Sequence, residues 1–136
     1  MGRQRMIVLD THILLWWLSD TRDLSSRARK AIDKAAAQAP LVLSAISVFE
    51  IGTGVRRQRI QLAVPFDHWL ADVCKLPELR MMPVTAEVSA IAASYDPAVH
   101  GDPADRIILA TAQVLGLPLG TSDEKLRASQ AVALAW

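Results

Sequence analysis

Apolar and polar positions along the chain fall into blocks that predict strands followed by helices. Residues 6–9, Met-Ile-Val-Leu, form an apolar run that ends at Asp10. An uninterrupted run of this kind is typical of a strand buried on both faces, as in the middle of a parallel sheet. Residues 13–18 are apolar almost throughout and indicate a helix packed against that strand. We therefore expect Asp10 at the carboxyl end of a central strand, the edge where open α/β sheets bind ligands.

The same succession of strand and helix continues to the end of the chain. Further strands are predicted at residues 41–44, 79–84 and 117–121, and a fifth is expected within residues 131–136. Helices are predicted at residues 24–37, 45–59, 66–75, 86–95, 102–115 and 122–126. Pro40, Pro97 and Gly116 stand where helices are expected to end. This order predicts a three-layer α/β/α sandwich around a mostly parallel sheet of about five strands.

Composition limits the class of protein. A length of 136 residues suits one domain over residues 1–136, with residues 1–5 as a short N-terminal extension. Hydrophobic residues make up 51% of the chain, so we expect a homodimer or another protein to cover part of the surface. No apolar run near the start approaches the ~20 residues of a membrane span, and no signal peptide is recognisable. The single cysteine, Cys74, fits a reducing cytoplasm, and a net charge of +1 leaves only local basic surface for nucleic acid.

Four acidic residues fall at equivalent places relative to the expected strands. Asp10 and Asp123 follow strands, whereas Glu50 and Asp105 are expected in the first turns of helices. In a parallel sheet all four would crowd at the carboxyl edge, where like charges raise one another's pKa. A hard divalent cation relieves this repulsion, and a set of oxygen ligands favours Mg²⁺ or Mn²⁺. Such an ion binds a phosphate and activates water for hydrolysis.

Two of these carboxylates have simpler explanations as helix caps. Asp10 could cap the helix that follows it, although Thr11 is also available for that role. Residues 47–50, Ser-Val-Phe-Glu, match a capping box in which Glu50 would only bond the backbone. No single carboxylate is a specific signal, whereas the ordered set of four is far more specific.

The later acidic residues also begin helices. Asp102 is expected mainly as an N-cap, with a proline at the first helical position. Asp105 favours the helix dipole and is the better ligand, since it points back toward the sheet edge. Ser122 or Asp123 could cap the last short helix, and Thr121 could bond the neighbouring backbone or position a water molecule.

Basic residues and histidines provide weaker signals. Arg106 could contact phosphate or carboxylate, or it could pair with Asp102 or lie on the helix surface. His12 and His100 could contact RNA, although a surface or capping role is more common for such histidines. The basic positions of residues 56–59 could bind a phosphate backbone or could complement a helix C-terminus.

Four stretches together resemble a known family of nucleases. They are residues 8–17 (VLDTHILLWW), 43–51 (LSAISVFEI), 100–110 (HGDPADRIILA) and 117–123 (LPLGTSD). In this order and spacing they resemble PIN-domain ribonucleases, specifically the VapC-type toxins of bacterial and archaeal toxin–antitoxin pairs. Phe49 and Ala104 stand where the family commonly has Trp and Phe. Gly120 replaces a β-branched residue, which predicts a looser strand end before Thr121.

The resemblance implies an activity and partners. It implies a five-stranded parallel sheet and an endoribonuclease dependent on Mg²⁺ or Mn²⁺, with Asp10, Glu50, Asp105 and Asp123 as the acidic site. Thr11, Asp102, Arg106, Thr121 and Ser122 are the expected supporting residues. The implied products carry a 5′-phosphate and a 3′-hydroxyl. The implied partners are RNA, a second copy of the chain and a VapB-type antitoxin that lays a C-terminal segment over the groove.

Two other functions remain open from the sequence. One is a PIN-domain nuclease that matures RNA and has no antitoxin, although the chain carries no added domain. The other is a catalytically silent module that binds RNA or protein through the same groove. The four intact carboxylates argue against the silent module.

Overall fold

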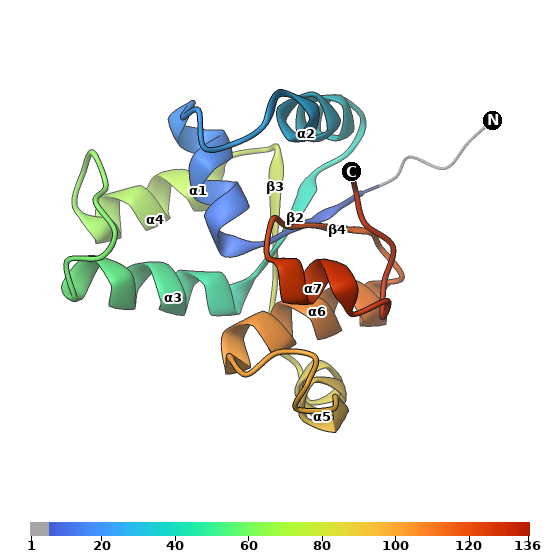
Figure 1. The fold of residues 1–136 in the computed structure, drawn as a ribbon. Helices are drawn as coiled ribbons and strands as arrows, with labels where there is room; N and C mark the ends of the chain where they lie inside the picture. The colour runs from blue at the N-terminus through green and yellow to red at the C-terminus, as the bar shows by residue number, and fades with distance from the viewer. Residues whose placement is uncertain (1–5) are drawn as a thin grey trace.

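Four parallel strands form the centre of the molecule, in the spatial order β3-β2-β1-β4 (Figure 1). The structure is a computed structural model that describes residues 6–136, so the expected extension at residues 1–5 lies outside the described part. The strands are β1 (Val8–Leu9), β2 (Leu41–Ser44), β3 (Leu79–Met82) and β4 (Leu119–Gly120). The helices are α1 (Thr11–Ser19), α2 (Ser26–Gln38), α3 (Ala45–Arg56), α4 (Phe66–Lys75), α5 (Ala86–Ser94), α6 (Pro103–Leu115) and α7 (Glu124–Ala128). The predicted α/β class is confirmed.

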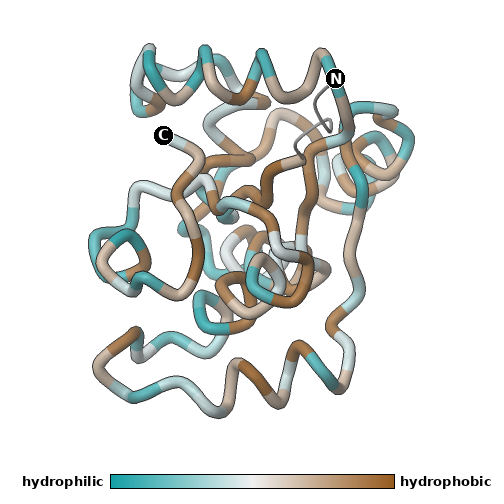
Figure 2. The backbone as a smooth tube through the Cα atoms, turned by 90° about the vertical axis from the view of Figure 1, so that its right-hand side faces the viewer, coloured by the Kyte–Doolittle hydropathy of each residue, from teal (hydrophilic) through white to brown (hydrophobic). Residues whose placement is uncertain are grey.

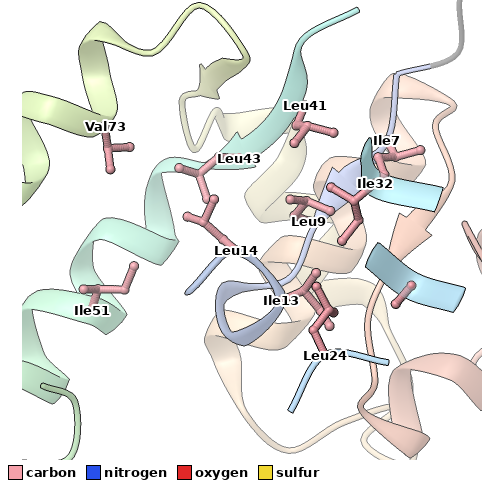
Figure 3. Close-up of a cluster of buried hydrophobic side chains, with 11 residues drawn as sticks. Ile7, Leu9, Ile13, Leu14, Leu24, Ile32, Leu41, Leu43, Ile51 and Val73 are labelled. Carbon is pink, nitrogen blue, oxygen red and sulfur yellow. The ribbon is translucent and has the colours of Figure 1, made fainter. Parts of the chain in front are cut away.

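The short strands bury alternate residues on opposite faces of the sheet. Leu9, Leu41 and Leu43 belong to one hydrophobic cluster, which also contains Ile13 and Ile32 from α1 and α2 (Figure 3). Val8 and Val42 belong to a second cluster on the other face, with side chains of α6 and α7. α5 packs on α6 and forms an outer layer there (Figure 1). Because both faces are covered, the strands read as continuous apolar runs, and apolar residues gather in the interior (Figure 2).

The expected fifth strand is reduced to one bridge. Leu134 pairs in parallel with Leu119, and the Leu119 amide donates to the Ala133 carbonyl at 2.9 Å. The Ala135 amide returns a bond of the same length to the Leu119 carbonyl. β4 has only two residues, so there is little ladder for a neighbouring segment to extend, and the sheet has four strands rather than five.

Side chains at the helix ends agree with most of the predicted boundaries. Ser25 caps α2, Thr85 caps α5 and Gly116 ends α6 with a φ of +66°. The start of α3 differs from the capping-box prediction, because Ser44, the last residue of β2, is the N-cap and its Oγ accepts from the Ile46 amide at 3.2 Å. Strand and helix are joined without a loop, so Glu50 lies beyond the first turn of α3. None of the helices within residues 6–136 combines the length and apolar character needed to cross a membrane.

The register of the strands decides what meets at the carboxyl edge of the sheet. Leu9 pairs with Leu43 on one side and with Gly120 on the other. The next residues along these strands are Asp10, Ser44 and Thr121, which therefore lie side by side. The Asp10 amide continues the ladder by donating to the Gly120 carbonyl at 3.0 Å. Most of the buried polar side chains of residues 6–136 lie at or beside this edge.

Candidate active site

Asp10 lies at the end of β1 and is 6% exposed. Its backbone occupies the N-cap position of α1, but its side chain makes no capping hydrogen bond, so the capping explanation fails. Instead Thr121 Oγ1 donates to Asp10 Oδ2 at 2.7 Å. Burial raises the pKa of Asp10 above its ordinary value, although the bonds from Thr121 and from the Thr11 backbone partly oppose the shift. The carboxylate is thus held in the interior with few donors, a costly arrangement for a negative charge.

Glu50 accepts a hydrogen bond from Thr11, which is in turn hydrogen-bonded to Ser47. Thr11 Oγ1 donates to Glu50 Oε1 at 2.5 Å and lies 2.7 Å from Ser47 Oγ. Because the single hydroxyl proton of Thr11 is used for Glu50, Ser47 must donate to Thr11. Burial raises the pKa of Glu50, and the negative charges of Asp102 and Asp10 add to the shift. Ser47 therefore supports the site as a donor and does not cap the helix, a role that the sequence did not indicate.

The first turn of α6 presents two acidic residues with different roles. Asp102 is the N-cap, as predicted, and its Oδ1 accepts from the Ala104 amide at 2.8 Å. The Asp105 side chain is only 16% exposed. Burial, followed by the charges of Asp10 and Asp102, raises its pKa from 3.8 to about 7. Asp105 is therefore the carboxylate on which the negative charge of its neighbours has the clearest effect.

Asp123 and His100 complete the cluster. Asp123 caps α7, since its Oδ1 accepts from the Leu126 amide at 3.0 Å. His100 Nε2 lies 3.0 Å from Asp123 Oδ2 and 3.2 Å from Asp105 Oδ2. Burial alone would raise the pKa of Asp123, but the bonds from Leu126 and His100 outweigh it and lower the pKa. A surface or capping role was expected for His100, and only its spacing, two residues before an N-cap aspartate, could have indicated a place in the cluster.

The four predicted carboxylates interact electrostatically and so form one cluster. The charge of Asp10 raises the pKa of both Glu50 and Asp105, and the charge of Asp123 raises that of Asp10. Mutual repulsion between partly buried oxygen donors is the condition that a hard divalent cation relieves. Ligand atoms of His100, Asp105 and Asp123 lie within 4.8 Å of one another. The residues present therefore fit a divalent ion of the Mg²⁺ or Mn²⁺ type.

The remaining predicted supporting residues divide into two groups. Thr11 and Thr121 orient carboxylates, and Thr121 Oγ1 also accepts from the Asp123 amide at 3.0 Å. Ser122 is exposed and makes no hydrogen bond within residues 6–136. Arg106 matches none of its expected roles, because its guanidinium donates to the carbonyls of Ala92, Tyr95, Asp96 and His100. It ties the segment between α5 and α6 to α6 and so fixes the backbone of His100.

A groove of about 460 Å³ adjoins the acidic cluster. Glu50 and Asp102 line it, and so do the basic residues Arg57 and Arg59. Phe49, which also lines the groove, is 69% exposed, an unusual position for a large apolar side chain. Acidic, basic and aromatic groups therefore lie along one concave surface.

Comparison with known proteins agrees with this arrangement. A ribonuclease of Mycobacterium tuberculosis, VapC22, is 38% identical over 121 residues, which cover 89% of each chain. The structure of FitAcB from Neisseria gonorrhoeae is similar with a TM-score of 0.65 and 27% identity, covering 95% of this chain and 96% of that one. VapBC2 from Rickettsia felis, bound to a DNA fragment from its promoter, has a TM-score of 0.69 at 15% identity and shares the fold. The superposition with VapBC2 covers 95% of this chain and 96% of that one.

A comparison with protein families identifies the family to which this chain belongs. Residues 7–130 match the PIN domain family, and this range contains every carboxylate of the cluster. With the 38% identical ribonuclease, this shows that the chain belongs to the PIN domain family and has a VapC-type relative.

Proposed function

We propose that this chain is the toxin of a VapBC-type toxin–antitoxin pair and an endoribonuclease that depends on Mg²⁺ or Mn²⁺. The observation that carries the proposal is the meeting of Asp10, Glu50, Asp105 and Asp123 at one sheet edge, where their charges raise most of one another's pKa values. The similarity to a VapC-type ribonuclease over most of the chain supports the same activity. The expected products carry a 5′-phosphate and a 3′-hydroxyl.

The four carboxylates would hold the ion, and the residues around them keep these oxygens in place. When bound, a divalent ion supplies positive charge for a phosphate and lowers the pKa of a coordinated water. Thr121 orients Asp10, and Thr11 orients Glu50, each through a short hydroxyl bond. Asp102 adds negative charge at the rim while capping α6. Rigid donors of this kind reduce the rearrangement needed at the moment of reaction.

The groove beside Glu50 would carry the RNA. Arg57 and Arg59 are exposed and form no ion pair within the part of the chain that the structure describes. They can therefore meet phosphate groups, and the exposed ring of Phe49 offers a face on which a base can stack. A single strand bound in this way would present a phosphate to the carboxylates at the side of the groove.

The names of similar proteins suggest the partners. Another structure with the same fold is a toxin–antitoxin complex from Klebsiella pneumoniae. We infer a VapB-type antitoxin that covers the groove and keeps the enzyme inactive, and a homodimer that forms a larger complex with it. We place the activity in the cytoplasm, where the exposed Cys74 would remain reduced.

RNA cleavage by the purified chain, freed of antitoxin, tests the proposal. End-labelled RNA is incubated with Mn²⁺ and with wild type, Asp10→Asn or Asp72→Asn. Asp72 is an exposed carboxylate on α4, so its substitution is a control for charge alone. Wild type and Asp72→Asn should cleave and should stop when the metal is chelated, and Asp10→Asn should be slower by about a hundredfold or more. If folded wild type is as inert as Asp10→Asn, the chain is a binding module and the proposal is wrong.

A further inference from the structure

Arg127, a half-buried residue of α7, joins two parts of the backbone beside the acidic cluster. Its Nη1 donates to the Thr121 carbonyl at 2.9 Å, and its Nη2 donates to the Trp136 carbonyl at 3.0 Å. A planar guanidinium can hold two such acceptors in fixed directions at the same time. Arg127 forms no ion pair within residues 6–136, so any effect on the carboxylates passes through the backbone that it binds.

One of these carbonyls belongs to the residue that orients Asp10. β4 ends at Gly120, whose carbonyl accepts from the Asp10 amide, so the Thr121 carbonyl lies beyond the ladder with β1. Thr121 is fully buried, and a carbonyl without a donor would be costly there. The side chain of the same residue donates to Asp10 and accepts from the Asp123 amide. Thr121 thus holds two carboxylates of the site, and Arg127 holds Thr121.

The helix that carries Arg127 is too short to fix Asp123 by itself. α7 has five residues, and isolated helices of this length are unstable in water. Asp123 is its N-cap, and Leu126 anchors one side of the helix in the hydrophobic interior. The guanidinium of Arg127 closes the turn before the helix, because it binds the residue two positions ahead of the cap.

On its other side, Arg127 is attached to the segment that covers β4. Leu134 forms a bridge to Leu119, and the Trp136 ring lies against position 120, where an added Cβ would meet it at 2.7 Å. The bond from Arg127 to the Trp136 carbonyl links this covering segment to α7. The end of β4 and the turn that follows it are therefore held together by one side chain.

We propose that Arg127 is a positioning residue of the active site, which fixes the Thr121 backbone so that the hydroxyl of that residue stays on Asp10. The inference rests on the proposed metal-dependent activity. Without the guanidinium, the turn of residues 121–123 gains freedom, and Asp10 and Asp123 lose the fixed directions that they share. Partners behind the ligands of a metal site typically change its affinity or activity by about 10–100-fold.

A double-mutant cycle in the metal-free chain tests whether Arg127 acts on the Thr121 hydroxyl. Denaturant unfolding with a chelator present gives the shift in midpoint caused by Thr121→Val in wild type, in Arg127→Ala and, as a control, in Lys125→Ala. Lys125 is an exposed basic residue of the same helix and makes no side-chain hydrogen bond within residues 6–136. The shift should be less than about half as large in Arg127→Ala as in wild type, and unchanged in Lys125→Ala.

Binding of Mn²⁺ and cleavage of RNA then test the effect on the site. Free Mn²⁺ is followed by electron paramagnetic resonance during titration of the folded proteins. Arg127→Ala should bind Mn²⁺ about tenfold more weakly than wild type, whereas Lys125→Ala should keep the wild-type affinity. In RNA cleavage, kcat of Arg127→Ala should fall while KM stays unchanged, because Arg127 is not among the residues that line the groove.

Three results would overturn the inference. They are additive midpoint shifts in the cycle, wild-type Mn²⁺ affinity in folded Arg127→Ala, and a raised KM with unchanged kcat, which would mark a contact to RNA. If Arg127→Ala does not fold, Arg127→Lys replaces it in both tests, since an amine reaches only one of the two carbonyls. Wild-type behaviour of that variant would also overturn the inference. Wild type that neither binds Mn²⁺ nor cleaves RNA would contradict the proposed function, whereas the cycle, measured without metal, still decides whether Arg127 holds Thr121.

Discussion

Thr121 Oγ1 donates a 2.7 Å hydrogen bond to Asp10 Oδ2, joining residues 111 positions apart in the chain. The bond exists because β4 lies beside β1 in parallel register, so both strands end at the same level. It is buried, and it gives the most enclosed carboxylate of the site its only side-chain donor within the described residues. The position of Asp10 therefore depends on a strand from the other end of the molecule.

Replacement of Thr121 by Val should weaken both the fold and the site. The valine keeps the shape but removes the donor to Asp10 and the acceptor for the Asp123 amide. We expect the free energy of unfolding to fall by about 2 kcal/mol at pH 8, because a buried carboxylate loses its partner. The loss should become smaller as the pH falls, because burial raises the pKa of Asp10 and the protonated group no longer carries a charge that needs the donor. Thr121→Ser retains the hydroxyl, and equal losses in both variants, measured by denaturant unfolding, would contradict this role.

Asp105 should make the metal-free protein less stable as the pH rises. Its pKa is 3.8 in its ordinary state and about 7 in the folded chain, so the folded state holds the proton more tightly. The stabilising proton is fully present below pH 4 and is lost as the pH rises to 7. The side chain of Asp105→Asn is neutral at every pH. At pH 8 the free energy of unfolding of this variant should therefore exceed that of wild type by about 1–2 kcal/mol. Partial exposure of the carboxylate to water keeps this gain small.

The pH dependence of the difference in free energy of unfolding between Asp105→Asn and wild type tests this prediction. Measured by urea unfolding in the presence of a chelator, the advantage of Asp105→Asn should shrink steadily between pH 7 and pH 4. Saturating Mg²⁺ should remove it at pH 8, because the ion stabilises only the carboxylate. A variant that is less stable than wild type at pH 8 without metal would contradict the raised pKa.

Position 120 should tolerate only glycine, because the ring of Trp136 occupies the space that a side chain would need. A Cβ at position 120 would lie 2.7 Å from Trp136 Cζ3 and Cη2, and 3.2 Å from Leu9 Cδ2. The sequence suggested that a glycine here would loosen the strand end, whereas the ring fills the space and residues 119–121 are buried. Gly120→Val should therefore cost about 2–3 kcal/mol.

A double-mutant cycle tests the contact between position 120 and the ring. In a Trp136→Ala background the same valine should cost at least about 1 kcal/mol less, because the ring is no longer in its way. Additive effects of the two substitutions, measured by thermal or denaturant unfolding, would mean that the ring does not explain the glycine.

Arg106 should behave as a structural residue and not as a contact to RNA. It donates to four backbone carbonyls between residues 92 and 100. Arg106→Ala should lower the free energy of unfolding by about 2–3 kcal/mol, and Arg106→Lys should recover only part of it because the amine cannot span the same acceptors. The salt dependence of RNA binding should stay unchanged in the lysine variant. A changed salt dependence in a fully stable alanine variant would mark a phosphate contact.

The sequence predicted the elements well where apolar runs were bounded by proline, glycine or a capping side chain. α4 begins and ends at the predicted residues, and α6 begins after Asp102 and ends before Gly116. Residues 131–136 alternate in the same way as a strand, but pairing depends on a partner long enough to continue the ladder. Such a tertiary condition is not visible in the local pattern.

The convergence of the carboxylates at one edge could be predicted because parallel strands bring their ends together there, whereas the side chains that orient them could not. The capping box at Glu50 failed because β2 runs directly into α3, so Ser44 caps the helix and Ser47 turns to Thr11. The places of His100 and Arg106 depend on how the segment before α6 folds back. Neither residue type nor spacing specifies the carbonyl and carboxylate groups that they meet.

The position of a bound ion tests the central claim most directly. Crystals of the chain soaked in Mn²⁺ give an anomalous difference signal that locates the metal without reference to any assumed ligand. The account predicts one peak within direct coordination distance of Asp10 and at least one more of Glu50, Asp105 and Asp123, and loss of that peak in Asp10→Asn. A peak away from this edge of the sheet, or no peak at saturating Mn²⁺, would contradict it.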